Sequence, residues 1–394
     1  MIRFLSWMAQ LALLTLASYN AVTALWGWPD RLRAREGSRR RRFRVVVPAH
    51  DEATVIERIL ADLRALDYPD DRYDVWVIAD RCTDDTAAVA AGLSRVDVRS
   101  AGGGGKGAAL AWHLARHPLD ADEALVVFDA DNRVPETFLA RVADELDAGH
   151  AVLQAYLDVS NPDASPLATA SALSYWAGNR MVQLARTNLG WSADLGGTGM
   201  VFTAEALAAV GGFGDTLTED QELGARLALE GIRVEWLHDL RIFDEKPTEV
   251  SAVVGQRARW MAGRRSVALR YVPDLWAEAV RRRSPALFDQ GLRLAQPSRT
   301  VVAGITTVLA AAAAITSSPF LLPWPALAVA AAIQIAEPVP FLARDDVPGR
   351  YLARYPLLAA LGVLWIPIRV VSGRVAGWYH TPHAGDEVSP RGPS

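Results

Sequence analysis

Cysteine is almost absent from this chain of 394 residues, because Cys82 is its only one. A single thiol excludes an intramolecular disulfide and any metal cluster held by several thiolates. Lysine is nearly as scarce, with Lys106 and Lys246 alone, so arginine supplies almost all of the positive charge. The formal net charge is only -4. The composition therefore predicts no nucleic-acid partner.

Long apolar stretches are the positive feature of the composition. Hydrophobic residues make up 51% of the chain and the mean hydropathy is +0.10, yet 22% of the residues are charged. This combination predicts a soluble-type domain joined to membrane segments.

The first apolar stretch, residues 4–28, contains no Asp, Glu, Lys or Arg and is long enough to cross a bilayer as a helix. A cleaved signal peptide is the alternative, but the dense arginine run follows the stretch, at residues 31–44. We therefore expect residues 1–30 to be a transmembrane anchor and residues 31–42 a basic juxtamembrane linker. The positive-inside rule places the amino terminus outside a bacterial plasma membrane and the following domain in the cytoplasm.

Short apolar runs then alternate with helical patterns. Residues 44–48, 74–80 and, more weakly, 96–98 predict strands, and residues 53–66 and 108–116 predict helices. This alternation is typical of an α/β doubly wound sheet, which binds ligands beyond the carboxyl ends of its strands.

Acidic residues fall at such strand ends. Asp129 and Asp131 close the apolar run 124–128, and alternation along a strand predicts that both point to one side. Paired carboxylates suit Mg²⁺ or Mn²⁺ that also contacts phosphate, although a simple turn after a strand is the alternative. Glu52 and Asp80 end neighbouring strands, so we expect all four acids to meet in one crevice.

The glycine-rich segment 102–107 is not a typical phosphate loop, because Gly107 follows Lys106 where Ser or Thr would hold a metal. We expect a mobile loop that brings Lys106 to a helix start, with a plain flexible loop as the alternative. The seven histidines show no H-E-x-x-H or comparable metal spacing, so they are predicted to be structural, except for His50 at the crevice.

Several segments in order support a family. VVVPAHDE, VIADRCTDDT, GKGAAL and FDADN resemble the nucleotide-sugar-binding half of family 2 glycosyltransferases with the GT-A fold. The segments 196–199, 210–213, 217–220 and 244–248 are similar to the acceptor half. The Q-x-x-R-W motif at 256–260 resembles that of the membrane-embedded synthases of chitin, hyaluronan, cellulose and poly-N-acetylglucosamine.

The resemblance covers roughly residues 43–265 and implies a catalytic domain of Rossmann-like mixed sheet. One position departs from it, since Ala79 replaces the first acid of the usual pair, which leaves Asp80 alone for the uracil-facing role. The resemblance implies inverting transfer from a UDP-sugar to a growing polysaccharide through a β-linkage.

Chemistry and the family resemblance together imply the roles of the site residues. The leaving diphosphate needs positive charge and the incoming hydroxyl needs a base. We expect Asp131 and Asp129 to bind Mg²⁺ or Mn²⁺ and Asp220 to be the catalytic base, although acids are also common at a helix start. The expected donor-binding residues are Pro48, His50, Glu52, Asp80, Lys106, Asp129 and Arg259, and the expected acceptor-binding residues are Gly197, Thr198, Glu219, Gln256 and Trp260.

The remainder of the chain alternates between amphipathic and apolar segments. Residues 266–296 predict amphipathic segments at the membrane surface, with a soluble closing helix as the alternative. Residues 297–343 predict two transmembrane helices joined by the turn 317–319, with Glu337 near a membrane edge. Residues 344–383 form a third apolar segment that is interfacial, re-entrant or transmembrane, and the tail 384–394 is predicted to be disordered.

The third segment ends in Trp378-Tyr379-His380-Thr381-Pro382-His383, which resembles the W-x-x-T-x-R gating loop of these synthases, with His383 in place of arginine. Trp378, Thr381 and His383 are therefore expected to gate the site.

Three other functions remain open at this point. The first is an enzyme that adds a single sugar to a lipid-linked or oligosaccharide acceptor. The second is a non-catalytic nucleotide-binding scaffold, and the third is a membrane-anchored nucleotidyltransferase. Three or four spans are few for a translocation channel, so membrane lipids and either a homo-oligomer or an accessory membrane subunit are the expected partners of a polymerising enzyme.

Overall fold

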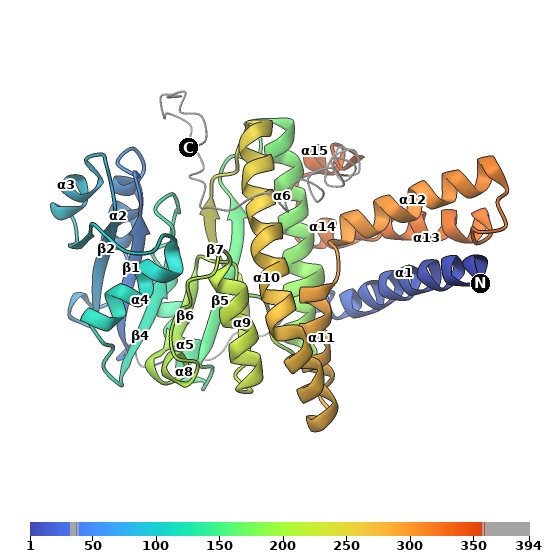
Figure 1. The fold of residues 1–394 in the computed structure, drawn as a ribbon. Helices are drawn as coiled ribbons and strands as arrows, with labels where there is room; N and C mark the ends of the chain where they lie inside the picture. The colour runs from blue at the N-terminus through green and yellow to red at the C-terminus, as the bar shows by residue number, and fades with distance from the viewer. Residues whose placement is uncertain (32–36, 38, 357, 359–394) are drawn as a thin grey trace.

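A seven-stranded mixed sheet organises the domain that follows the N-terminal helix (Figure 1). The computed structural model describes residues 1–31, 37, 39–356 and 358. The strand order is β3-β2-β1-β4-β6-β5-β7. The strands are β1 (Arg42–Ala49), β2 (Tyr73–Asp80), β3 (Arg95–Arg99), β4 (Glu123–Val127), β5 (Val152–Val159), β6 (Met200–Thr203) and β7 (Val234–Asp244).

The first half of the sheet is parallel. β1 pairs in parallel with both β2 and β4, and β2 pairs in parallel with β3. β6 runs antiparallel to its neighbours β4 and β5. The mixed sheet and the strands expected at residues 44–48, 74–80 and 96–98 are confirmed. The carboxyl ends of β1, β2 and β4 lie on one edge of the sheet, where such sheets bind ligands.

Each face of the sheet has its own core, because successive side chains of a strand point to opposite faces. Val45 and Val47 of β1 pack with one cluster and Val46 with the other. The first cluster includes side chains of α2 (Ile56–Arg64) and α5 (Phe138–Asp147). The second includes side chains of α4 (Lys106–Arg116), α6 (Pro166–Gly178) and α9 (Glu219–Leu229). Shorter helices are α3 (Thr86–Ala91), α8 (Ala204–Ala209), η1 (Leu25–Gly27) and η2 (Asp70–Arg72).

Helix α6 continues through a π-helical segment η3 (Asn179–Leu184) into α7 (Ala185–Asn188). In Figure 1, α6 and the long helix α10 (Val250–Arg282) stand between the sheet and the helices on the right of the view. Because α10 passes through residue 265, the expected end of the catalytic domain falls inside a helix.

Helix α11 (Pro285–Ala295) folds back against α10. A shared apolar cluster includes Val267 and Leu275 of α10, Leu287 of α11 and Ala225 of α9, so the pair is packed on the catalytic domain. Leu269 and Val280 remain exposed on α10, and the placement of residues 266–296 at a membrane surface stays a prediction.

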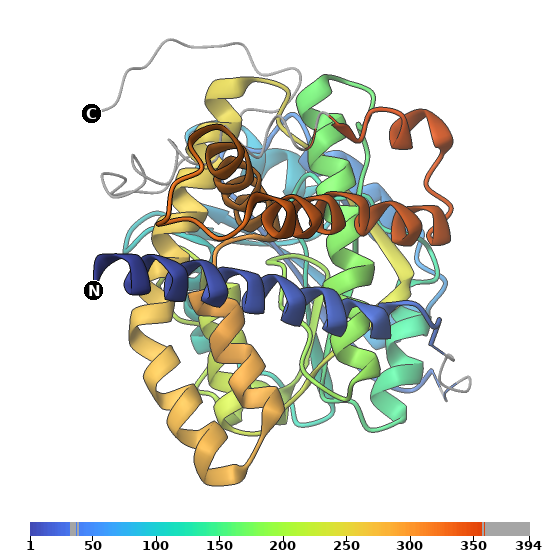
Figure 2. The same ribbon diagram turned by 90° about the vertical axis from the view of Figure 1, so that its right-hand side faces the viewer.

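Three described helices are long and apolar enough to cross a membrane, and they span residues 2–27, 299–316 and 324–344. They consist of α1 (Ile2–Ala24) with η1, α12 (Arg299–Thr316), and α13 (Trp324–Ala336) with α14 (Pro338–Arg344). Figures 1 and 2 show them as a group that extends away from the sheet.

Glu337 pairs with Arg299 at the start of α12, at 2.5 Å, and its place near a membrane edge stays a prediction. A short helix, α15 (Gly349–Leu352), follows. The third apolar segment beyond residue 358, the gating residues Trp378, Thr381 and His383, and the tail lie outside the described residues.

Candidate functional site

A cavity of about 780 Å³ lies at the carboxyl edge of the sheet and is closed by α4, α9 and the start of α10. Glu52, Asp80, Asp129 and Asp131 all line it, so the predicted convergence of the acids is confirmed. The other expected donor, acceptor and base residues line the same cavity: Pro48, His50, Lys106, Gly197, Thr198, Glu219, Asp220, Gln256, Arg259 and Trp260. Their individual roles stay predictions.

The segment Asp129–Asp131 lies on a turn and not on a strand. β4 ends at Val127, so the argument from strand alternation was wrong for these two acids, although both face the cavity. The turn is held from two sides, because the Asp129 amide donates to Asn132 Oδ1 at 3.1 Å and to Thr198 Oγ1 at 3.0 Å. Thr198 Oγ1 also donates to Asn132, and both side chains are buried.

Lys106 is the first residue of α4, two residues earlier than the expected helix start. Its ammonium group donates to Asp129 and, at 2.6 Å, to the carbonyl oxygen of Gly197. The side chain therefore lies between the acidic turn and the glycine motif, and a ligand phosphate would compete with Asp129 for it.

Asp80 is held by a cation that the sequence did not indicate. Arg99, at the end of β3, donates from Nη1 to Asp80 Oδ1 at 2.7 Å, and both side chains are buried. The carbonyl oxygen of Asp80 accepts from His50 Nδ1 at 2.6 Å. Ala79 is buried beside it, so one carboxylate, fixed by Arg99, stands where the resembled family has two.

Glu219 and Asp220 occupy the first turn of α9 after the N-cap residue Thr218. The Asp220 carboxylate accepts from the Gln221 amide at 2.8 Å, and its Oδ2 would lie 3.7 Å from a Cβ added at Gly197. Burial raises the pKa of both carboxyl groups, and for Glu219 the charge of Asp220 adds to the effect. Such a shift brings a carboxylate closer to the proton affinity that a general base needs.

The Q-x-x-R-W motif lies on α10. Among the described residues, Arg259 Nε is buried and has no hydrogen-bond partner, so this guanidinium can take an anionic ligand. The Arg257 guanidinium lies 5.0 Å from the centre of the Trp260 ring. One face of this tryptophan is therefore covered by a cation, which leaves less of the ring for a sugar than the sequence predicted.

A buried lysine also lines the cavity. Lys246 Nζ lies 2.5 Å from Asp244 Oδ2 and 3.6 Å from the centre of the Tyr175 ring, and all three residues line the cavity. The scarcity of lysine was a signal for this position, because Lys106 and Lys246 are the only lysines and both are in the cavity.

A second cavity, of about 750 Å³, adjoins the first. The two share the lining residues Ser174, Gln221, Arg257 and Trp260. The second cavity is lined mainly by apolar side chains of α6 and α10 and extends to Pro297–Val301, where α12 begins. It therefore connects the neighbourhood of Asp220 with the start of α12, one of the helices long and apolar enough to cross a membrane.

The acidic turn fits a divalent cation. Asp129 and Asp131 both line the cavity, and among the described residues neither belongs to a cluster of three or more metal-compatible groups. One or two carboxylates, with the remaining positions left to phosphate oxygens and water, is the arrangement that Mg²⁺ prefers.

Comparison with known proteins gives a consistent result. A family model described as "Glycosyltransferase like family 2" matches residues 40–263, more than half of the chain. The beta-monoglucosyldiacylglycerol synthase of Synechocystis sp. is 33% identical over 236 residues, which cover 56% of this chain and 47% of that protein. The glucomannan 4-beta-mannosyltransferase 2 of Arabidopsis thaliana is 27% identical over 233 residues, covering 56% and 43%. The chain spans about half the length of the curated synthases that it matches.

A solved structure covers more of the chain. The mannosyltransferase of Pyrobaculum calidifontis in complex with GDP-Man and Mn²⁺ aligns with a TM-score of 0.60 and 22% identity, covering 93% of this chain and 99% of that one. At this identity the likeness shows a shared fold.

Proposed function

The chain belongs to glycosyltransferase-like family 2 and is a glycosyltransferase, and we propose that it transfers one sugar from a UDP-sugar to a lipid acceptor, with inversion to a β-linkage. The observation that carries this proposal is the second cavity. An apolar space that runs from the base of α12 to Trp260 and Arg257 suits an acceptor whose hydrocarbon part stays near the membrane.

Two further observations support a lipid acceptor. The synthase of Synechocystis sp. carries a glucosyl-diacylglycerol product in its name. The three candidate spans pack at the side of the catalytic domain where the second cavity ends. We propose that they anchor the enzyme as a multi-pass protein of a bacterial plasma membrane, with the amino terminus outside and the site in the cytoplasm.

In the proposed reaction, the acceptor hydroxyl oxygen bonds to the anomeric carbon while the bond from that carbon to the diphosphate breaks. Asp220 accepts the hydroxyl proton, and UDP leaves with the bonding electron pair. Lys106 and Arg259 contact the diphosphate and offset its growing negative charge. Asp80, positioned by Arg99, contacts the base of the nucleotide.

Asp131, with Asp129, would hold a divalent cation on the diphosphate, and this cation would supply Lewis-acid stabilisation of the leaving group. The carboxylates and the open cavity support this assignment. The likeness to a fold that was solved with Mn²⁺ is consistent with it.

Addition to a growing polysaccharide is the second candidate. The Q-x-x-R-W motif lines the cavity and one group of relatives is named for glucomannan synthesis, which favours it. Family membership removes the basis for a non-catalytic scaffold or a nucleotidyltransferase.

The test uses the purified full chain in nanodiscs with Mg²⁺ or Mn²⁺ and each common UDP-sugar, with and without diacylglycerol. UDP release that requires diacylglycerol, with one sugar gained by the lipid, supports the proposal. A high-molecular-weight glycan formed without added lipid would establish the polymerising alternative.

Two variants of α10 sharpen this test. Ala268 lines the second cavity and not the first, so Ala268→Trp should raise KM for the lipid at least tenfold and leave UDP binding unchanged. Ala277→Trp, at an exposed position on the same helix, is the matched control. Equal lipid KM for both variants would contradict the second cavity as the acceptor site.

A further inference from the structure

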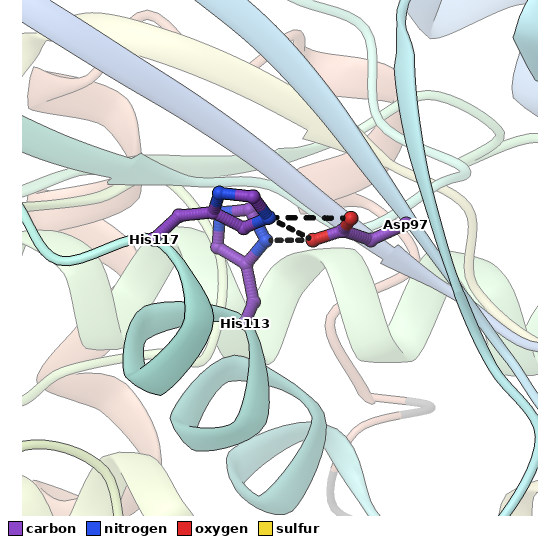
Figure 3. Close-up of side chains that lie close together, drawn as sticks. All are labelled: Asp97, His113 and His117. Atoms are coloured by element: carbon purple, nitrogen blue, oxygen red, sulfur yellow. Dashed lines mark hydrogen bonds and ion pairs between the residues drawn. The ribbon is translucent and has the colours of Figure 1, made fainter.

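Two histidines and an aspartate lie together away from the catalytic cavity. His113 lies in the last turn of α4, His117 caps the same helix, and Asp97 lies in the middle of β3 (Figure 3). Figure 3 shows both imidazole rings directed at the Asp97 carboxylate. The potential ligand atoms of the three side chains lie within 4.8 Å of one another.

We propose that Asp97, His113 and His117 bind a divalent transition-metal ion of the zinc type, in a site separate from the catalytic one. Two imidazole nitrogens and one carboxylate oxygen are a common zinc donor set, with a fourth position left for water.

The distances support this assignment. His117 Nε2 lies 3.2 and 3.4 Å from the two Asp97 oxygens, and His113 Nδ1 lies 2.7 Å from Oδ2. Ligand atoms about 2.0–2.1 Å from a tetrahedral zinc are roughly 3.3 Å apart. The His117 pair already has this separation, and the His113 pair needs to open by about 0.6 Å. Metal binding would replace the two hydrogen bonds without moving either element.

The surroundings fix one face of the site and leave another accessible. The Trp76 ring of β2 packs against the His113 and His117 rings, with centroid distances of 5.1 and 4.6 Å. His113 is fully buried, while His117 is about one third exposed, which gives an ion a route from solvent.

The Arg44 guanidinium fixes the backbone beneath His117. It donates from Nη1 to the His117 carbonyl oxygen at 2.5 Å, and its charge is paired with Glu123 at 2.8 Å. The loop that carries His117 is therefore held in place without the metal, so little ordering entropy opposes metal binding.

The spacing of His113 and His117 is visible in the sequence. His113 and His117 are four residues apart, which is the i,i+4 spacing of the two ligands in H-E-x-x-H. The sequence alone does not pair them with Asp97, because this residue lies on a strand 20 residues away from His117 in the sequence.

An ion here would join two elements that reach the catalytic cavity. The same strand that carries Asp97 carries Arg99, which holds Asp80, and the same helix that carries the histidines begins with Lys106. Zinc would therefore tie the edge strand β3 to α4 and stabilise the nucleotide half of the domain.

The experiment measures metal binding by the full chain in detergent, stripped with EDTA and without nucleotide. One equivalent of Co²⁺ should produce the visible absorption bands of a tetrahedral site, and Zn²⁺ should displace it. His117→Gln should lower the Zn²⁺ affinity at least tenfold and abolish the bands, and Asp97→Asn should act in the same direction. Wild-type protein that shows no tetrahedral bands would overturn the proposal, whatever the variants do.

Two control variants separate this site from others. His150→Gln removes a histidine that lies beside Glu145 and Glu235, and it should leave the Co²⁺ spectrum unchanged. Asp131→Ala should also leave it unchanged, since it alters only the catalytic cavity. Loss of the bands in either control, with His117→Gln retaining them, would place the ion elsewhere.

Discussion

Two adjacent carboxyl groups, those of Glu219 and Asp220, enter the cavity from the first turn of α9. Burial raises the pKa of each, and Lys106 acts on both in the opposite direction. Asp220 Oδ2 would lie 3.7 Å from a Cβ added at Gly197, and both residues line the cavity. These contacts favour Asp220 as the base and Glu219 as a neighbour that tunes it.

Asp220→Asn should reduce sugar transfer to background and leave nucleotide affinity nearly unchanged, because the amide has the same shape and cannot accept the proton. In the wild type, kcat should rise with pH through a limb above the ordinary aspartate pKa of about 3.9, since only the deprotonated carboxylate acts as a base. Transfer rates and UDP binding measured over pH test both statements. A folded variant that has lost UDP binding would remove Asp220 from the role of base.

Asp131→Ala should weaken nucleotide binding only when a divalent cation is present, because Asp131 is the proposed ligand of that cation. The measurement is UDP affinity with and without Mn²⁺, in wild type and variant. Asp71→Ala is a control, since Asp71 is an exposed partner of Arg72 and does not line the cavity. Equal affinities for wild type and Asp131→Ala under both conditions would contradict the metal assignment.

At the scale of the elements, the family resemblance and the GT-A fold were predictable from sequence and are confirmed. The strands β1, β2 and β4 are recognisable in the sequence by their buried β-branched residues, and the acids Glu52, Asp80, Asp129 and Asp131 lie at or just beyond their ends. The motifs do not predict the conformation of the backbone that connects them. The turn at Asp129 depends on Thr198, which lies 69 residues later in the chain.

Contacts between distant elements explain the remaining differences. Arg99 reads as a surface arginine at the end of a weak strand, and only the pairing of β2 with β3 brings it to Asp80. Likewise, the helical spacing of the residues does not show which side chain covers the Trp260 ring. The contact with Arg257 is visible only in the structure. Local sequence patterns thus predicted which residues line the site. The tertiary structure was needed to show which of these residues contact one another.

The start of α4 packs so tightly on the loop before α9 that only glycine fits at position 107. A Cβ there would lie 2.1 Å from the Gly214 carbonyl oxygen and 2.9 Å from Glu219 Cβ. Gly107→Ala should therefore shift Lys106 away from the cavity, raise KM for the donor at least tenfold and cost about 1–3 kcal/mol of stability. Donor KM and denaturant unfolding measure these effects.

Gly103→Ala is the matched control in the same loop. A Cβ at Gly103 meets nothing within 4 Å, and its φ is not positive. This variant should behave as the wild type. If both variants lower donor affinity alike, the effect comes from loop flexibility and the packing argument fails.

For the whole molecule, buried charges join the N-terminal membrane helix to the catalytic domain. Arg180 of η3 donates to the Gly27 carbonyl oxygen at 2.9 Å and pairs with Asp30 and Asp345. Arg186 of α7 pairs with Asp289 of α11, and Tyr19 of α1 donates to the same carboxylate at 2.8 Å. The candidate span that contains α1 and η1 is therefore fixed to the domain by directional polar contacts.

Asp289→Ala should destabilise the protein by about 3–5 kcal/mol, because it leaves the buried Arg186 without its anionic partner. Unfolding in detergent, followed by heat or denaturant, measures the loss. Glu278→Ala, which breaks exposed pairs with Arg281 and Arg282, should change stability little. Similar losses for the two variants would show that the junction contributes no more than a surface ion pair.

The residues that α1 contacts lie far from it in the sequence, and this has a consequence for biosynthesis. Tyr19 and Asn20 contact Asp289 and Gln296, and Ser6 contacts the Phe320 carbonyl oxygen. A ribosome that adds about 5–20 residues per second needs roughly 14–54 s to make the 270 residues from Tyr19 to Asp289. During that interval the contacts of Tyr19 and Asn20 with α11 are missing, and the nearest polar contacts of this end of the chain are those of Gly27 and Asp30 with Arg180.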